Sequence, residues 1–299
     1  MRKRKLGSSN IEISEISLGG MSLPTSVTEA LPIIETALDA GINYFDTADL
    51  YDKGTNEEII GELLKPYRQE VVIATKVGNR WNDEKDGWYW DPSPAHIENG
   101  LKMSLKRLRT DYIDVYQLHG GTIDDPWEEI IETFERLKKE GYIREYGISS
   151  IRPNVFKPFL EKSNAISNMM QYNVLDRRPE EWFDDLSNTN ASIVTRGSIA
   201  KGLLTNEWPK RLENSNGYLT YSKEELQKVL TDLQNSYEDI HAASIGFNLS
   251  HPIIASIVIG ASTKQQLLEN LKAYEKSQSI TDFTPIQKIT KKDLYNEHR

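Results

Sequence analysis

Short β-favouring runs alternate with amphipathic helical segments eight times along this chain. The run at 71–76 is apolar and β-branched, as expected of a buried parallel strand, whereas Ile97, Leu101, Leu105 and Leu108 recur at helical spacing. Each unit continues into the next without a linker. Because right-handed crossovers bring eight such units into one closed ring of strands, we predict an α/β fold, a single (β/α)8 barrel.

The predicted elements follow this alternation. Strands are expected at 15–18, 42–45, 71–76, 111–118, 142–148, 167–172, 191–195 and 254–259, and helices at 29–40, 55–64, 93–108, 126–140, 153–162, 179–186, 223–234, 238–249 and 264–274. Thr55 is the expected N-cap of its helix, with Glu58 at the capping-box position. Gly7-Ser8-Ser9-Asn10 predicts an N-terminal hairpin suited to the barrel floor. One domain is expected over 1–299, with a polar tail at about 277–299 that crosses the barrel mouth or frays.

The charge balance and the missing cysteines exclude several functions. The chain of 299 residues has 45 acidic and 36 basic side chains, a net charge of −9, and no cysteine. This argues against nucleic acid or an anionic membrane as partner, and it excludes disulfides and thiolate sites. The basic N-terminus leads into no apolar signal segment, and no run is long enough to span a membrane, so we expect a cytoplasmic monomer or weak homo-oligomer.

Cofactor and metal motifs with a fixed spacing are missing from the sequence. There is no G-x-G-x-x-G, no Walker sequence and no H-E-x-x-H, and the five histidines are scattered as single residues. A doubly wound dinucleotide domain is therefore disfavoured, and no metal site is expected.

Four polar residues fall at the same end of neighbouring predicted strands. Asp46 follows the second strand, Tyr51 lies in its loop, Lys76 ends the third strand and His119 follows the fourth. Each has an ordinary alternative, since Asp often forms turns, Lys and Asp often form simple ion pairs, and His is often a core residue. In an α/β barrel the loops at the carboxyl ends of the strands build the active site, so their coincidence favours function.

The chemistry expected of these four residues is carbonyl reduction. A Lys that closes an apolar strand needs a carboxylate partner such as Asp46. The positive charge favours the ionised form of a neighbouring phenol, which makes Tyr51 a usable general acid. His119 can donate a hydrogen bond that polarises a carbonyl oxygen for attack by a hydride.

Seven sequence segments together carry a resemblance to a known family. They are Gly41-x-x-x-Phe45-Asp46-Thr47-Ala48-x-x-Tyr51 with Asn56-Glu57, Ala74-Thr75-Lys76, Leu118-His119, Gly147-Ile148-Ser149, Gly202-Leu203-Leu204-Thr205, and Gly260-Ala261-Ser262 through Glu269-Asn270. With these motifs the chain resembles the aldo-keto reductases over essentially its whole length. The resemblance implies a catalytic tetrad of Asp46, Tyr51, Lys76 and His119, with Tyr51 as proton donor, and NADPH, with NADH as the alternative, bound across the barrel mouth.

The resemblance also implies where the cofactor is held. Ser149 and Ser150 would approach the nicotinamide carboxamide, the loop at 196–203 would cover the pyrophosphate, and the region at 262–270 would hold the adenosine end. The residues concerned are Gly20, Met21, Ser149, Ser150, Gln171, Arg196, Gly197, Ser198, Ile199, Lys201, Gly202, Leu203, Gly260, Ser262, Thr263, Gln266, Glu269 and Asn270. Backbone N–H groups, a hydroxyl and a cation in the 196–203 loop suit a pyrophosphate on physical grounds as well.

The sequence departs from the common family pattern at four positions. Ser150 replaces an Asn, Met169 replaces a carboxamide-reading Gln, and Arg196 replaces an aromatic that stacks on the nicotinamide. Gln171 would compensate for Met169, and an Arg guanidinium can itself stack on a ring. Gln266 stands where an Arg often binds the 2′-phosphate, so the expected preference for NADPH is modest.

Four aromatic residues cluster in the segment at 78–92. These are Trp81, Trp88, Tyr89 and Trp90. They suit an apolar or aromatic carbonyl substrate, and we take Trp81, Trp88 and Trp90 as candidate substrate contacts. Packing of the loop against the barrel explains them equally well.

Two other functions stay open at the level of the sequence. One is a slow or inactive barrel that senses NADP(H) and regulates a partner. The other is an aldolase or lyase with Lys76 as a Schiff base, although a Lys paired with Asp46 should stay protonated and unreactive.

Overall fold

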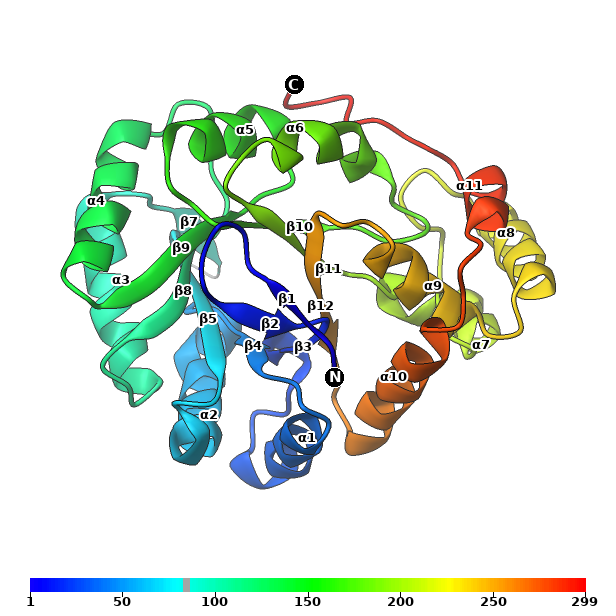
Figure 1. The fold of residues 1–299 in the computed structure, drawn as a ribbon, viewed down its shortest axis with the longest axis horizontal. Helices are drawn as coiled ribbons and strands as arrows, with labels where there is room; N and C mark the ends of the chain where they lie inside the picture. The colour runs from blue at the N-terminus through cyan, green and yellow to red at the C-terminus, as the bar shows by residue number, and fades with distance from the viewer. Residues whose placement is uncertain (83–86) are drawn as a thin grey trace.

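A closed barrel of eight parallel strands forms the centre of the molecule (Figure 1). The computed structural model describes residues 1–82 and 87–299. The barrel strands, in spatial order, are β10 (Ser167–Gln171), β11 (Ser192–Arg196), β12 (Ile254–Gly260), β3 (Ile16–Gly19), β4 (Tyr44–Asp46), β5 (Val72–Val77), β8 (Ile113–Leu118) and β9 (Ile143–Ser149). The predicted (β/α)8 fold class is therefore confirmed.

Helices surround the barrel as its outer layer (Figure 1). They are α1 (Val27–Asp39), α2 (Thr55–Leu64), α3 (Pro94–Arg107), α4 (Trp127–Lys139), α5 (Pro153–Lys162), α6 (Phe183–Ser187), α7 (Trp208–Glu213), α8 (Lys223–Ser236), α9 (Ile240–Leu249), α10 (Lys264–Ser277) and α11 (Thr284–Ile289). Several begin at polar caps: Ser93 accepts a hydrogen bond from the N–H of His96, and Ser222 forms a capping box with Glu225. None of the described helices is both long and apolar enough to cross a membrane.

Two apolar cores follow from this layering. The larger one lies between the strands and the surrounding helices, where Phe45, Ile73 and Leu118 are fully or almost fully buried. The smaller one fills the barrel interior, and it includes Tyr44 and Val115. Because the interior is filled by side chains, ligands are confined to the ends of the barrel.

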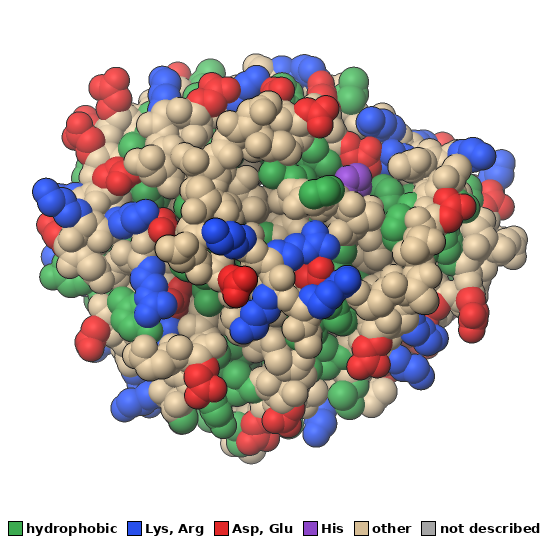
Figure 2. Space-filling model, viewed as in Figure 1, with side chains coloured by type: hydrophobic (Ala, Val, Ile, Leu, Met, Phe, Trp, Pro, Cys, Tyr) green, Lys and Arg blue, Asp and Glu red, His purple; other side chains and the backbone are tan. Residues whose placement is uncertain are grey.

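The N-terminal hairpin closes one end of the barrel, as predicted. Strands β1 (Lys3–Lys5) and β2 (Glu12–Ser14) pair antiparallel, and Leu6 and Ile13 are fully buried in the inner core. The hairpin lies across the barrel in Figure 1, and Figure 2 shows the same face with charged side chains of both signs over it. Two of its cations, Arg2 and Arg4, pair with the buried carboxylate of Glu15.

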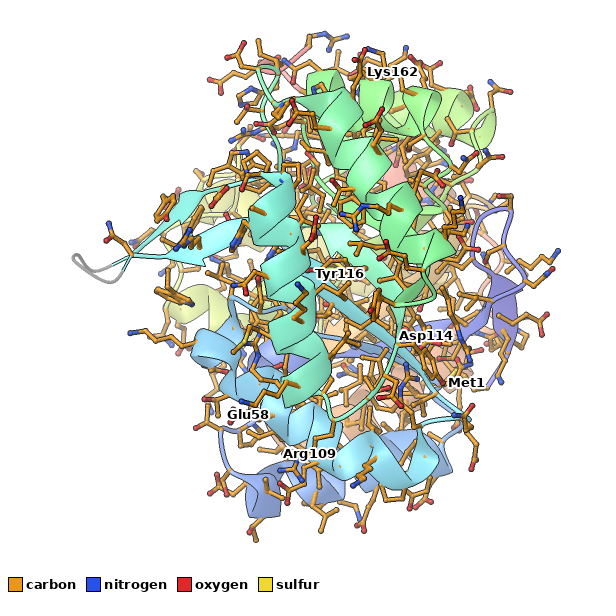
Figure 3. The ribbon with its side chains drawn as sticks, turned by 90° about the vertical axis from the view of Figure 1, so that its left-hand side faces the viewer. Met1, Glu58, Arg109, Asp114, Tyr116 and Lys162 are labelled. Carbon is orange, nitrogen blue, oxygen red and sulfur yellow. The ribbon has the colours of Figure 1, made fainter. Side chains whose placement is uncertain are left out.

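A second hairpin extends from the opposite end of the barrel (Figure 3). Strands β6 (Asn79–Trp81) and β7 (Trp88–Trp90) pair antiparallel, so the segment at 78–92, expected as a loop, forms a β-ribbon instead. Aromatic residues explain the difference, because they favour strands and because Trp81 pairs with Trp88 across the ribbon. Residues 83–86, between these two strands, lie outside the described residues.

Three further details differ from the expectations. Gly54, with φ of 93°, is the N-cap of α2, and Thr55 is its first helical residue, so the expected capping box is wrong. Helix α7 was not expected in the loop after β11, since it has only 6 residues. The segment after α10 contains α11 and the buried Tyr295, which the side chain of Arg178 contacts.

Replacement of Gly61 by Ala tests how closely α2 packs on the outer layer. A Cβ there would lie 2.5 Å from the Cα of Leu108, so backbone must move. The usual gain of about 1 kcal/mol for Ala over Gly in a helix should be outweighed by overpacking that costs about 1–3 kcal/mol. Denaturant unfolding should show a loss of stability for Gly61→Ala. The exposed Glu58→Ala on the same helix should change it by less than about 0.5 kcal/mol, and a stabilised Gly61→Ala protein would contradict the packing argument.

Candidate active site

The four candidate catalytic residues come together at the carboxyl end of three neighbouring strands. Asp46 is the last residue of β4, Lys76 lies near the end of β5, and His119 directly follows β8. Tyr51 lies in the loop after β4, where its backbone N–H donates to Ala48 O. Because these strands are parallel and adjacent in the barrel, their ends meet at one face.

A buried ion pair organises the site. The ammonium of Lys76, which is 0% exposed, donates to Asp46 Oδ2 at 2.7 Å, to Thr47 O at 2.6 Å and to the Tyr51 hydroxyl at 3.4 Å. Burial alone would lower the pKa of Lys76, but the attraction of Asp46 and Tyr51 outweighs burial and raises the pKa above its ordinary value. Burial also raises the pKa of Asp46, against the opposing effect of Lys76. With three acceptors around its nitrogen, Lys76 holds its proton.

Tyr51 and His119 face each other beside this pair. Their rings are 6.0 Å apart between centroids and meet edge to face, and the Lys76 nitrogen lies 4.9 Å from the Tyr51 ring centroid. The His119 backbone is fixed by Val77 O at 2.7 Å and by the side-chain amide of Asn79 at 2.9 Å. Within the described structure, His119 Nδ1 is buried and has no hydrogen-bond partner.

The imidazole of His119 is neutral. Burial, followed by the positive charges of Lys76 and Arg196, lowers its pKa to about 3. A neutral imidazole keeps one N–H donor and offers no proton to a base, so His119 can bind a carbonyl oxygen without competing with Tyr51 as the acid.

A cavity of about 1000 Å³ opens above these residues. Asp46, Tyr51 and His119 form its base, and Trp88 and Trp90 form part of its wall. Of the expected cofactor contacts, those that line it are Met21, Ser149, Ser150, Gln171, Arg196, Gly197, Ile199, Lys201 and Gly260. Trp81, the third candidate substrate contact, does not line it, and Lys53 lies over its ring instead.

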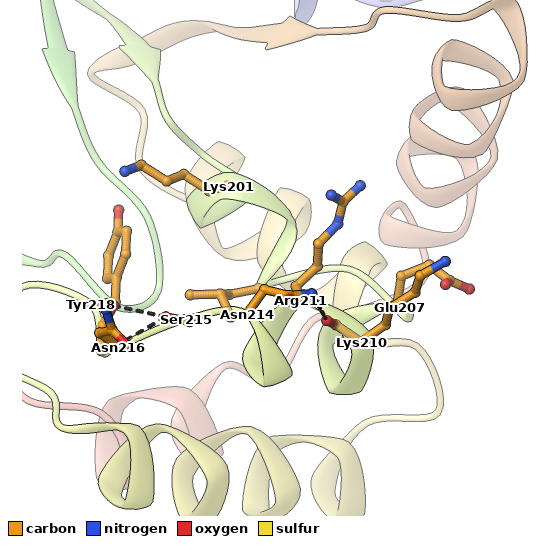
Figure 4. A pocket seen from close by; sticks show the side chains of 10 residues that line it. Lys201, Glu207, Lys210, Arg211, Asn214, Ser215, Asn216 and Tyr218 are labelled. Carbon is orange, nitrogen blue, oxygen red and sulfur yellow. Dashed lines mark hydrogen bonds between the residues drawn. The ribbon is translucent and has the colours of Figure 1, made fainter.

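Part of the expected pyrophosphate loop faces a second cavity of about 510 Å³ (Figure 4). Leu203 lines this cavity together with Arg211, while Lys201 lines both cavities. Gly202 is packed under Arg211, and Ser198 is buried beside Thr195 at 3.3 Å between their hydroxyl oxygens. Lys201 therefore lies between the two cavities. Its own backbone has a φ of 57°.

The side chain of Gln171 is held in one orientation. Its amide nitrogen donates to Asp176 Oδ2 at 2.8 Å, and its oxygen accepts from Arg196 at 3.3 Å. Asp176 is itself buried and accepts two hydrogen bonds from Arg178, at 2.7 and 2.8 Å. Since Arg178 also lies over the ring of Tyr295, the C-terminal segment supports this wall of the cavity.

The residues expected at the adenosine end lie on and beside the first turns of α10. Thr263 caps this helix by accepting from the N–H of Gln266, and Ser262 donates twice to Gln266 Oε1, at 2.9 and 3.0 Å. Asn270 is buried and Glu269 is exposed. Gly20 packs against Asn56, which donates to its carbonyl oxygen at 2.7 Å.

Comparison with known proteins identifies the family of this chain. The model of the aldo/keto reductase family matches residues 15–291. The chain belongs to the aldo/keto reductase family. It is 50% identical over its whole length to an uncharacterized oxidoreductase, YqkF, of Bacillus subtilis, all of which it covers. It is 28% identical to an NADH-specific methylglyoxal reductase of Escherichia coli, over 97% of this chain and 98% of that protein.

The fold of this aldo/keto reductase also matches a solved structure closely. The holo form of the aldo-keto reductase AKR11C1 from Bacillus halodurans has a TM-score of 0.92 and 48% sequence identity, with 100% of this chain and 99% of that chain covered. The chain is thus an oxidoreductase of this family.

Several residues that line the cavity of this aldo/keto reductase were not expected. They include Asn79, Gly120, Gly121, Thr122, Ile151, Arg152, Tyr218 and Leu219. Arg152 carries the same signal that identified His119, a polar residue just after the end of a barrel strand. Tyr218 and Leu219 lie far along the loop after β11, where spacing alone gives no indication of a contact.

The neutral state of His119 can be tested by titration. Because the folded-state pKa of about 3 lies below the ordinary 6.5, the imidazole signals should stay constant between pH 5 and 8. The NMR spectrum of His119→Asn assigns the signals by their loss. A titration midpoint near 6.5 for His119 would contradict the neutral assignment.

Proposed function

We propose that this protein is an NAD(P)H-dependent carbonyl reductase that converts an aldehyde or ketone to an alcohol. The observation that carries the proposal is the contact of Tyr51 with a protonated, buried Lys76 at the base of a large cavity. A phenol in this position can protonate an oxygen that develops negative charge. Membership of the aldo/keto reductase family supports the same chemistry.

The cavity fits a nicotinamide cofactor. It is large and lies at the barrel mouth, with polar groups of Ser149, Ser150 and Gln171 in its wall, and the buried amide nitrogen of Asn168 nearby lacks a partner in the described structure. The bound cofactor would supply the hydride. Arg196 and Lys201 bring positive charge to the side where the expected phosphate-binding loop lies, which suits a dinucleotide.

Each residue of the tetrad has a distinct role in this proposal. Tyr51 gives its proton to the substrate oxygen, and Lys76 stabilises the phenolate that remains, because its charge lies 3.4 Å from the hydroxyl oxygen. Asp46 keeps the lysine charged and in place. His119 donates a hydrogen bond to the same substrate oxygen and so orients the carbonyl for attack.

The protonated state of Lys76 speaks against the Schiff-base alternative. An amine must lose its proton before it attacks a carbonyl carbon, and Lys76 is surrounded by acceptors and has a raised pKa. A slow cofactor-sensing protein would keep the same geometry, so measured turnover separates it from the reductase.

Tyr51→Phe tests the proton donor. Steady-state consumption of NADPH with a panel of simple aldehydes should fall by about 100-fold or more, because general acid catalysis typically contributes a factor of 10² to 10⁴. Cofactor binding, followed by protein fluorescence, should stay close to that of the unmodified protein. Tyr67→Phe, at an exposed site, serves as the matched control. Retention of more than about a tenth of the turnover would refute the assignment.

The cofactor preference is the second test. The N-terminus of α10 offers Ser262, Thr263 and the cation of Lys264 to a 2′-phosphate, and all three are exposed. Such exposed contacts contribute about 1 kcal/mol, so kcat/KM for NADPH should exceed that for NADH by less than about tenfold. Lys264→Gln should reduce the ratio, whereas Lys272→Gln on the same helix should not. A preference for NADH in the unmodified protein would overturn this phosphate site and leave the tetrad chemistry untouched.

A further inference from the structure

Arg152 stands on the wall of the cavity and has no carboxylate partner among the described residues. It follows β9 and caps α5, and no ion pair joins it to another described residue. Its backbone N–H donates to Ser150 Oγ at 3.3 Å, and its Nη1 donates to Gly121 O at 3.0 Å. The first contact fixes the backbone of Arg152, and the second holds its guanidinium at the cavity wall and leaves the other guanidinium N–H groups for a ligand.

This wall is the one nearest the catalytic histidine and the aromatic ribbon. Gly121, which accepts from Arg152, is two residues beyond His119. A Cβ on the intervening Gly120 would lie 3.3 Å from the ring of Trp90, so that ring covers this loop directly. Arg152, Trp90 and His119 therefore line one continuous part of the cavity.

A described carboxylate beside this wall, that of Asp125, is already satisfied. Asp125 accepts from Trp90 Nε1 at 2.9 Å, from the Thr122 N–H at 2.7 Å and from the Thr122 hydroxyl at 2.7 Å. It does not line the cavity and forms no ion pair with Arg152. The charge of Arg152 is thus left free to act on a ligand.

The cavity as a whole is positive in an acidic protein. Among the described residues that line it, Asp46 is the single carboxylate, and Lys76 neutralises it, whereas Arg152, Arg196 and Lys201 are cationic. The whole chain has a net charge of −9. Arg196 and Lys201 lie on the side proposed for the cofactor, so Arg152 is the cation left for the substrate.

We infer that the substrate is a carbonyl compound that carries a carboxylate, which Arg152 binds while the carbonyl group lies between Tyr51 and His119. The inference rests on the proposed function and names its substrate class. The reaction balance is unchanged, because the hydride goes to the carbonyl carbon, the proton of Tyr51 goes to its oxygen, and the carboxylate takes no part. Trp88 and Trp90 would pack on the apolar part of such a molecule.

Matched pairs of substrates test this preference. The acids 3- and 4-carboxybenzaldehyde are compared with their neutral methyl esters, and kcat/KM is measured at low and at high salt. The acid of at least one pair should be preferred by about tenfold or more at low salt, because hydrogen bonds to a charged group contribute roughly that much. Salt should weaken the preference, since Arg152 is exposed.

Variants assign the preference to one side chain. Arg152→Gln should reduce the acid-to-ester ratio to near one, and Arg152→Lys should restore part of it. Lys157→Gln removes the same charge from an exposed position on α5, where Lys157 pairs with Asp185, and should leave the ratio as it is. A ratio near one in the unmodified protein, or one that survives Arg152→Gln, would overturn the inference.

Binding gives a readout that does not need turnover. Calorimetry should show that benzoate binds at least about tenfold more tightly than benzamide, and that Arg152→Gln removes this difference. Equal binding of the two, or loss of the difference in Arg196→Gln instead, would count against Arg152. If neither esters nor acids are reduced, the proposed function fails, while the benzoate measurement still decides the anion site.

Discussion

The contact between the Lys76 ammonium and the Asp46 carboxylate is the interaction on which the rest of the site depends. An unpaired ammonium at a position that is 0% exposed would lose its proton or destabilise the fold, and the carboxylate at 2.7 Å prevents this. The Lys76 ammonium also donates to Thr47 O, and this hydrogen bond ties the charge to the loop that carries Tyr51. One buried pair thus keeps a positive charge next to Tyr51, the proposed proton donor.

That pair also contributes to the neutral state of His119. Burial lowers the pKa of His119 most, and the positive charge of Lys76 disfavours a second cation nearby, so this pKa falls to about 3. The roles proposed for Tyr51, as acid, and for His119, as hydrogen-bond donor, are therefore consistent with the electrostatics of the site as well as with its geometry. At the mouth, Arg152 and Arg196 are exposed cations and are proposed to hold anions, whereas the buried Lys76 contacts the hydroxyl of Tyr51.

The periodicity of the sequence was sufficient to predict the barrel, and much of the catalytic end followed from it. Strand ends in a parallel barrel all lie at one face, so placing Asp46, Lys76 and His119 required only the strands. The ribbon formed by β6 and β7 was expected as a loop because its strands have 3 residues each, too few for a period to show. Thr55 was expected as the N-cap because its hydroxyl suits that role, but Gly54 takes it with a left-handed backbone. The hydrogen-bond network of Gln171, Asp176 and Arg178 could not be predicted in this way. It depends on tertiary packing that brings a loop against the end of a strand, and no local sequence pattern encodes such packing.

The loop that carries Tyr51 contains unfavourable backbone conformations and an unfavourably placed carboxyl group. Asp52 and Lys53 have φ of 49° and 54°, a region that side chains disfavour, and the half-buried Asp49 near them has its pKa raised to about 8, first by burial and then by Glu57. Because Asp49 is protonated in the folded protein up to about pH 8 and ionised above about 4 when unfolded, it reduces stability as pH rises through this window.

Two neighbours at the start of α2 offset these costs. Asn56 accepts from the Thr47 hydroxyl at 2.7 Å, and Glu57 accepts from Thr75 at 2.5 Å and from Arg107 at 2.6 Å. Since Thr75 adjoins Lys76 and Thr47 adjoins Asp46, these contacts fix the loop to the strands that carry the ion pair, which keeps the phenol of Tyr51 next to its lysine.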